Sequence, residues 1–494
     1  MGSINNMMLA SGVSLVIGRL TLTIINFSVL VILARALTPN AFGIIALSQA
    51  VIVLCQGILE AGFGSFLIQR RNLTSNLEHT TTITTIIIGS VMTVVVLSTA
   101  PFLASIMNAP EISITLQLLS INILLTSISN TSYNMMFRDM RFKSVITTEV
   151  ISIGIVRGGI SLLLAFNGYS YMAVIYATLC SQIVWTSIFL ILHPISLPYR
   201  VSAKSIISII RFIAPVSASN IMSMLALKID NFVVGRFFGQ ISLGYYSRAY
   251  ASIDLASSLL GSVFRTVILT GISKNNRLNT PSVQESHNQF FVAHVSAIMC
   301  IWPIALTSII AAPEIIKILL GEQWPQAVPL FKALAVGMFF RIGYKVSSSF
   351  NVAYGLVQIE VSRVFIFLIV MSLSTYIGSQ VSLLAVTFAV LFSLFLLYIM
   401  LTLITTSHLK IDNLLFVKNI MKPVIAMFVS SIISLVLCYQ LRSLFFWDVY
   451  IVITVLIVQL ISVSLYIKII GKHDNTIRLI NDKLTSYIKK YRVI

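Results

Sequence analysis

The chain consists largely of apolar runs that are long enough to cross a lipid bilayer. A membrane-spanning helix needs about 20 mostly apolar residues. Of the 494 residues, 57% are hydrophobic and 10% are charged, so such runs follow one another with little interruption. Because lipid offers the backbone no hydrogen-bond partners, each run must satisfy its own peptide groups and is expected to fold as a helix. The sequence therefore predicts an all-α integral membrane protein.

About fourteen transmembrane helices are predicted from the apolar runs and the polar segments between them. The expected spans are residues 7–36, 42–69, 79–106, 112–136, 146–166, 171–192, 207–238, 245–272, 288–311, 327–352, 359–377, 382–404, 421–440 and 448–468. The loops on one side, together with the C-terminal segment, hold most of the loop arginines and lysines, whereas the other side holds Lys317 and Arg442. By the positive-inside rule, we expect both termini in the cytoplasm.

Composition and motifs argue against several other classes of protein. The net charge of +18 is explained by membrane orientation, and no motif that interleaves basic and aromatic residues indicates a nucleic-acid partner. The four cysteines show no paired spacing, which favours neither a metal site nor a disulfide framework. No catalytic or nucleotide-binding motif occurs. We therefore expect no enzymatic activity, no cofactor, no metal and no nucleic-acid partner.

An internal repeat relates the two halves of the chain. Arg35 and Gly43 lie eight positions apart where the first predicted helix leads into the second, and Arg236 and Gly244 have the same spacing 201 residues later. Ala-Pro pairs at 100–101 and 312–313 recur at a similar offset. Repeats that are an even number of helices apart run parallel, related by an axis along the membrane normal, and transporters of this design bind substrate between the repeats.

This duplication predicts four regions of the chain. We expect an N-terminal six-helix lobe at 1–205 and a C-terminal six-helix lobe at 206–408, followed by two flanking helices at 409–470. The last region, 471–494, places apolar residues at helical spacing among lysines. It is either a basic amphipathic helix on the anionic inner leaflet or a solvated tail.

Cations deep inside apolar runs are the first candidates for a functional site, because a charge in the hydrocarbon core costs a few kcal/mol or more unless it meets water or a partner. The deepest are Arg19, Arg157, Arg265, Arg341 and Lys345. Arg341 and Lys345 are four residues apart on one helix face, where like charges repel. A shared anionic ligand such as a phosphate would offset this repulsion. The alternative is pairing with a remote acid such as Asp254 or Glu360.

Acidic residues are few within the apolar runs. The candidates for ion or proton coupling are Glu60, Glu149, Asp230 and Asp254. Each of them is equally well explained as a structural counter-ion for a buried arginine, since a paired carboxylate is the usual state of such a group in a membrane. The sequence carries no motif that decides between the two roles.

A polar stripe follows the fourth predicted helix. It consists of Asn122, Thr126, Asn130 and Asn134, which recur every four residues and therefore share one slowly drifting face. Polar side chains in membrane helices commonly hydrogen-bond to neighbouring helices. The alternative is that this stripe faces a glycan and hydrogen-bonds to its hydroxyl groups.

Three stretches of the chain resemble a known family. They are Arg35 to Gly43 with its Thr38-Pro39 and Phe42-Gly43 pairs, the Gly62-Phe63-Gly64 triplet that leads to Arg70-Arg71, and Asp230–Gly239 followed by Leu243–Tyr250. They are similar to polysaccharide repeat-unit flippases of the Wzx type, in particular to the branch of lipopolysaccharide, colanic-acid and teichuronic-acid exporters. These proteins belong to the multidrug/oligosaccharidyl-lipid/polysaccharide exporter superfamily. The resemblance covers most of the chain and fades in the last two helices.

The resemblance implies a function for the predicted lobes. It implies a flippase that moves an undecaprenyl-pyrophosphate-linked oligosaccharide repeat unit from the cytoplasmic to the outer leaflet of the bacterial inner membrane, for O-antigen or exopolysaccharide synthesis. Transport would proceed by alternating access through a cationic central cavity, while the prenyl tail stays in membrane lipid. We expect transport to be driven by an ion gradient, through coupling to Na⁺ or H⁺, or by the membrane potential, and we expect the polysaccharide polymerase machinery as a partner. Arg19 matches by position an arginine of the first helix on which relatives depend.

Other functions remain as alternatives. An ion-coupled multidrug antiporter of the MATE type would share the two-lobed design, but cationic drugs favour an acidic cavity and the apolar runs here hold more cations than acids. A membrane enzyme acting on the same lipids, such as a polymerase or ligase, is expected to carry a sizeable outer loop with catalytic arginine or histidine, and no such loop is predicted. A scaffold without transport activity is the last alternative.

Overall fold

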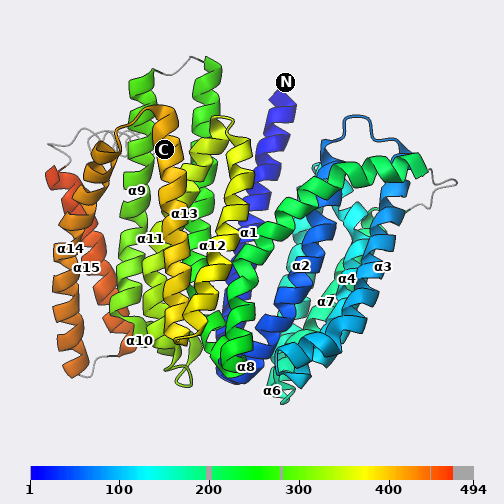
Figure 1. Cartoon of the computed structure of the whole chain (residues 1–494), viewed down its shortest axis with the longest axis horizontal. Coiled ribbons are helices and arrows are strands. Elements are labelled where there is room, and N and C mark those ends of the chain that lie inside the picture. The colour runs from blue at the N-terminus through cyan, green and yellow to red at the C-terminus, as the bar shows by residue number, and fades with distance from the viewer. Residues whose placement is uncertain (1, 196–202, 279–281, 445–446, 471–494) are drawn as a thin grey trace. The chain divides into compact units, whose positions relative to one another are not determined.

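The computed structural model describes residues 2–195, 203–278, 282–444 and 447–470. Within these ranges the regular elements are all helices (Figure 1). The chain divides into two compact units, Met1–Ser247 and Arg248–Ile494, and each is described by itself. The lobe boundary at 205/206 stays a prediction, and the predicted tail at 471–494 lies outside the described residues.

The N-terminal unit is formed by the first eight elements and the beginning of a ninth. These are α1 (Gly2–Ala36), α2 (Pro39–Gln69), α3 (Ser75–Ile106), α4 (Pro110–Arg138), α5 (Phe142–Glu149), the π-helix η1 (Val150–Arg157), α6 (Gly158–Phe166), α7 (Ser170–Leu192) and the first part of α8 (Ala203–Leu278). Helix α4 packs against α2, α3 and α7. The first part of α8 packs on α2, where Asn220 Nδ2 donates to the Gly57 carbonyl at 2.9 Å.

Local sequence explains where these helices begin. Thr38 precedes α2 in an extended conformation, and its hydroxyl accepts a hydrogen bond from the Ala41 N–H. Pro39 follows at the first helical position, where its missing N–H and fixed φ angle suit a helix start. Thr74 caps α3 in the same way. A capping side chain satisfies one of the otherwise unpaired N–H groups of the first turn.

The C-terminal unit contains the remainder of α8 and seven further helices. These are α9 (Val283–Ile310), α10 (Ala312–Leu320), α11 (Ala327–Ala353), α12 (Val357–Ser379), α13 (Leu383–Leu409), α14 (Asn413–Ser443) and α15 (Asp448–Ile470). Helix α11 packs against α9 and α13. The connection after Ala312-Pro313 folds as the short helix α10, which the sequence analysis did not predict.

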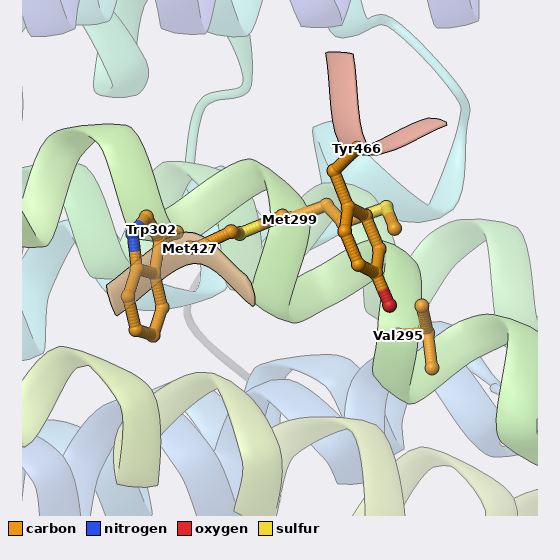
Figure 2. Packing of buried hydrophobic residues seen from close by; sticks show 5 residues of the cluster. All are labelled: Val295, Met299, Trp302, Met427 and Tyr466. Atoms are coloured by element: carbon orange, nitrogen blue, oxygen red, sulfur yellow. The ribbon is translucent and has the colours of Figure 1, made fainter. Parts of the chain in front are cut away.

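The last two helices belong firmly to the C-terminal unit. Figure 2 shows the apolar cluster that joins them to α9, which contributes Val295, Met299 and Trp302, with Met427 from α14 and Tyr466 from α15. An ion pair adds to this contact. The Arg442 guanidinium at the end of α14 donates to both carboxylate oxygens of Glu314 in α10, at 2.5 and 2.7 Å.

The lengths and composition of the helices confirm the all-α membrane fold. Twelve helices in the described part of the chain are long and apolar enough to cross a bilayer. One of them, Lys204–Ile272, covers the predicted spans 207–238 and 245–272 together, because α8 continues through a break at Gly239, where φ is +77°. The predicted span 421–440 corresponds to α14. Bulky apolar side chains such as Val91, Val94 and Val95 of α3 are exposed, as expected of a lipid-facing helix.

The two copies of the internal repeat meet inside the N-terminal unit. A β-carbon added to Gly43 would lie 1.8 Å from the carbonyl oxygen of Gln240, and one added to Gly244 would lie 1.9 Å from that of Pro39. Pro39 and Gln240 hold the same position in the two copies, as do Gly43 and Gly244. The contact is therefore reciprocal, as across a two-fold axis. Only glycine allows the two backbones to approach this closely.

Candidate functional site

A polar cavity of about 300 Å³ lies within the N-terminal unit, between α2, α4, η1 and α7. It brings together four of the residues predicted from the sequence, namely Glu60, Asn122, Thr126 and Arg157. Pockets for small molecules have volumes of about 300–1,000 Å³, so this cavity is at the small end of the range. Apolar side chains, among them Ile52, Leu119 and Ile153, also line the cavity.

Helical periodicity explains which side chains of α2 and α7 face the cavity. On α2 they include Gln49, Gln56 and Glu60, which lie seven and four residues apart on one face. On α7 they are Thr178, Ser181, Gln182 and Trp185, which follow the spacing of a single helix face. Gln49, Gln56 and these four residues were not predicted from the sequence. The signal was present, because polar side chains at helical spacing interrupt otherwise apolar runs at those positions.

Arg157 reaches the cavity from a π-helix. It is the last residue of η1, where the wider turn changes the angle between successive side chains relative to an α-helix. Its Nη2 donates to Asn26 Oδ1 of α1 at 3.1 Å. Such π-helical turns inside longer helices are frequent at functional sites. A reading of the sequence with the α-helical period does not predict this geometry.

The cavity carries one positive and one negative charge. Arg157 and Glu60 both line it, and no ion pair joins them in the described part of the chain. Formal charge therefore cancels across the cavity while both groups stay available to a ligand. The lining of the N-terminal cavity is therefore polar, without an excess of positive charge.

Several polar groups in the cavity wall lack protein partners. Asn122 is 5% exposed, and its Oδ1 accepts no hydrogen bond from the described residues. Gln49 and Gln182 make no hydrogen bonds to the described residues either. By contrast, Gln56 Nε2 donates to Thr126 Oγ1 at 3.2 Å. Buried polar groups are usually hydrogen-bonded. The buried Asn122 Oδ1 is therefore the group that a ligand donor would satisfy, whereas Gln49 is exposed and Gln182 is half-buried.

The polar stripe of α4 divides between two roles. Asn122 and Thr126 line the cavity, whereas Asn130 and Asn134 lie outside it. Asn130 Nδ2 donates to the Leu59 carbonyl of α2 at 3.0 Å, and Asn134 Nδ2 donates to Asn130 Oδ1 at 2.7 Å. Asn130 therefore holds α4 against α2, and Asn134 supports Asn130 from within α4. A glycan-facing role for the whole stripe stays a prediction.

Arg19 lies close to an acidic residue outside the cavity. The carboxylate of Glu149 is buried, and the positive charge of Arg19 acts on it. Arg19 itself is exposed. The roles of Arg19 in substrate binding and of Glu149 in coupling stay predictions.

Asp230, another coupling candidate, is held by hydrogen bonds inside the N-terminal unit. Its carboxylate is 1% exposed and accepts from the Tyr246 hydroxyl at 2.6 Å and from the Asn231 N–H at 2.8 Å. The tyrosine and the backbone N–H together stabilise the charged form of this carboxylate. Asp230 therefore lies in the protein interior with its carboxylate hydrogen-bonded.

The three remaining predicted cations lie in the C-terminal unit. Arg341 is 4% exposed, pairs with Asp254 at 2.6 Å and lies 4.3 Å from the ring centre of Tyr250. Lys345 Nζ donates to the Ser257 carbonyl at 3.4 Å. Arg265 is exposed on α8. The pairing of Arg341 with Asp254 is the alternative that the sequence left open, and a shared anion site for all five cations stays a prediction.

Known proteins relate this chain to polysaccharide synthesis. The family described as "Polysaccharide biosynthesis protein" matches residues 32–329, more than half of the chain. The chain belongs to this family. Its similarity to Wzx-type flippases, expected from the sequence, is thereby confirmed.

Individual relatives are distant in sequence. The teichuronic acid biosynthesis protein TuaB of Bacillus subtilis is 22% identical over 344 residues, covering 69% of this chain and 70% of that protein. The succinoglycan biosynthesis transport protein ExoT of Rhizobium meliloti is 24% identical over 320 residues, covering 63% and 62%. The lipopolysaccharide biosynthesis protein WzxC of Escherichia coli is 22% identical over 326 residues, covering 64% of each chain.

Solved structures share the fold. The lipid II flippase MurJ in an inward closed conformation superposes with a TM-score of 0.71 at 16% identity, covering 92% of this chain and 98% of MurJ. An inward-facing MATE multidrug transporter superposes with a TM-score of 0.64 at 14% identity, covering 79% and 94%. At these identities the similarity establishes the two-lobed membrane fold and leaves the substrate open.

Proposed function

We propose that this protein flips a lipid-linked oligosaccharide, an undecaprenyl-pyrophosphate-linked repeat unit, from the cytoplasmic to the outer leaflet of a bacterial inner membrane, with both termini cytoplasmic. The observation that carries the proposal is the polar cavity at Arg157, which is lined by membrane-spanning helices in a member of the polysaccharide biosynthesis family. Polar surface of this kind is costly inside a membrane protein unless a polar passenger uses it.

The chemistry of the passenger suits the cations of both units. A pyrophosphate needs a positive partner while it crosses the bilayer, since two unit charges 4 Å apart interact by about 4 kcal/mol at an effective dielectric near 20. Lys345 in the C-terminal unit provides such a charge without a carboxylate directly bound to it, whereas Arg157 in the N-terminal unit shares its cavity with Glu60 and can donate hydrogen bonds to the hydroxyl groups of the glycan. The prenyl tail would remain in lipid while the head group moves through alternating access.

We further propose that an ion gradient drives the movement and that the protein is not an enzyme. Glu60 lines the cavity, so binding of H⁺ or Na⁺ there would change the charge that the passenger meets. Polymerase machinery on the outer face would consume the flipped repeat unit. Glu60→Gln should abolish the dependence of transport on the gradient, and unchanged dependence would exclude Glu60 as the coupling site.

Gene deletion in the host tests the function. Deletion should trap lipid-linked repeat units on the cytoplasmic leaflet and remove surface polysaccharide, and the wild-type chain should restore both. Leaflet position is read from whether added glycosidase reaches the glycan in intact spheroplasts. Absence of trapped intermediates, together with increased drug sensitivity, would instead favour a multidrug antiporter.

Arg157 supplies a residue-level test. Arg157→Ala should reduce export tenfold or more, because charge-assisted hydrogen bonds contribute about 1.5–3 kcal/mol. Arg157→Lys keeps the charge but loses the planar fork, so we expect partial activity. Lys345→Met should impair export likewise. Equal amounts of each variant in the membrane fraction are the control, and full export by both charge-removing variants would refute these assignments.

A further inference from the structure

We propose that the N-terminal cavity binds an uncharged pyranose ring of the transported glycan, with Trp185 as its aromatic platform. This inference rests on the proposed flippase function and extends it by assigning a subsite for sugar rather than for pyrophosphate. Its residues are Gln49, Glu60, Asn122, Gln182 and Trp185.

The hydrogen-bonding groups of the cavity match sugar hydroxyls. A hydroxyl both donates and accepts, and amide side chains offer both functions. The amides of the exposed Gln49 and the half-buried Gln182 make no hydrogen bonds to the described residues, and the Asn122 Oδ1 is buried without a donor from them. A buried acceptor without a partner costs about 1–3 kcal/mol, so a ligand that donates to Asn122 would bind favourably.

The charges of the cavity disfavour pyrophosphate as its occupant. Arg157 is the cation of the lining and Glu60 opposes it with one negative charge. A carboxylate repels a phosphate but accepts a hydrogen bond from a hydroxyl. The same pair of charges therefore discriminates in favour of a neutral polyol, and the volume of about 300 Å³ suits a single ring rather than a whole repeat unit.

Trp185 is fixed in place by other aromatic rings. Its ring centre lies 4.9 Å from that of Phe189 and 5.5 Å from that of Tyr133. Trp185 is half-buried and contributes to the cavity wall. A rigid ring loses little conformational entropy on binding, and the apolar C–H face of a pyranose packs on an aromatic surface. Gln182 lies one turn away on the same helix face, where it can reach the hydroxyls at the ring edge.

Tryptophan fluorescence of the purified full-length chain tests the subsite. Free glucose, galactose and N-acetylglucosamine are titrated up to about 100 mM, since single rings are expected to bind with dissociation constants on the order of 1–10 mM. At least one sugar should change the emission saturably. Trp185→Phe should remove the response, and Gln182→Leu should raise the dissociation constant about three- to tenfold through loss of a neutral hydrogen bond.

Matched controls are available in the C-terminal unit. Trp447→Phe and Gln358→Leu change exposed residues of the same types and should leave sugar binding unchanged. A wild-type protein without a saturable response to any of the three sugars overturns the subsite. So does a response that persists in Trp185→Phe, or one that inorganic pyrophosphate abolishes by competition in the cavity.

Export in the deletion strain separates this inference from the proposed function. If the wild-type chain restores export and Gln182→Leu restores it only in part, the flippase function and the sugar subsite are both supported. If wild type and Gln182→Leu restore export equally, the sugar subsite fails while the flippase function stands. If deletion traps no lipid-linked glycan, both fail.

Discussion

Alanine at Gly43 or Gly244 should destabilise the N-terminal unit through the same reciprocal contact. Each added methyl carbon would lie less than 2 Å from a backbone carbonyl oxygen, whereas real contacts of this kind stay above 3.0 Å. The two backbones would therefore have to move apart by more than 1 Å. Overpacking of this kind costs about 1–3 kcal/mol, and we expect about 2–3 kcal/mol for each variant because backbone cannot rotate out of the way as a side chain can.

The assay is the midpoint of thermal unfolding of the purified chain in detergent, followed by tryptophan fluorescence. Gly159→Ala is the matched control, since no atom lies within 4 Å of its added carbon. Alanine is favoured over glycine inside a helix by about 0.5–1 kcal/mol, so this control should unfold at the wild-type temperature or slightly above it.

The two-fold character of the contact gives a sharper criterion. Gly43→Ala and Gly244→Ala should lower the midpoint by similar amounts. The double variant should lose less stability than the sum of the two single variants, because one separation of the two backbone segments relieves both clashes. Midpoints for both variants equal to that of Gly159→Ala would refute the reciprocal packing. Strict additivity would show that the two glycines act at independent contacts.

Further predictions concern the ion pairs of the C-terminal unit. Arg442→Ala should lower stability by about 1–3 kcal/mol, because it leaves the Glu314 carboxylate, which is 6% exposed, without its bidentate partner. The unfolding midpoint should recover when Glu314→Gln is added. A midpoint that does not recover would contradict the assignment of the effect to this ion pair. The pKa of Lys317 is raised by its hydrogen bond to Asp448. A raised pKa keeps the Lys317 ammonium charged. The contribution of this ion pair to folding stability is therefore full at neutral pH and is lost only as the pH rises through the raised pKa. Lys317→Gln should therefore change the midpoint equally at pH 6 and 8, and a difference between them would exclude this ion pair as the cause.

Local patterns were sufficient to predict the membrane fold and the family. The need for about 20 apolar residues per span is a property of the chain that no tertiary contact alters. The predicted span 171–192, for example, coincides within one residue with α7 (Ser170–Leu192). The repeat at Gly43 and Gly244 was likewise visible in the sequence, because close backbone approach excludes every residue with a side chain.

Tertiary packing decided which polar side chains share a site. The four-residue spacing predicted that Asn122 and Asn130 follow one helix face, but only contact with α2 assigned Asn130 to helix packing and Asn122 to the cavity. Arg157 reaches the cavity from a π-helix that the α-helical period does not predict.

The partners of buried charges also depended on the fold. Arg341 and Asp254 are 87 residues apart, and spacing within one helix carries no information about such a pair. Hydropathy and periodicity are set by neighbours along the chain, so the sequence by itself determined the helices, their membrane character and the duplication. Sites form where separate helices bring distant residues together, and for that reason only the tertiary structure distinguished the polar cavity from the ion pairs and helix contacts around it.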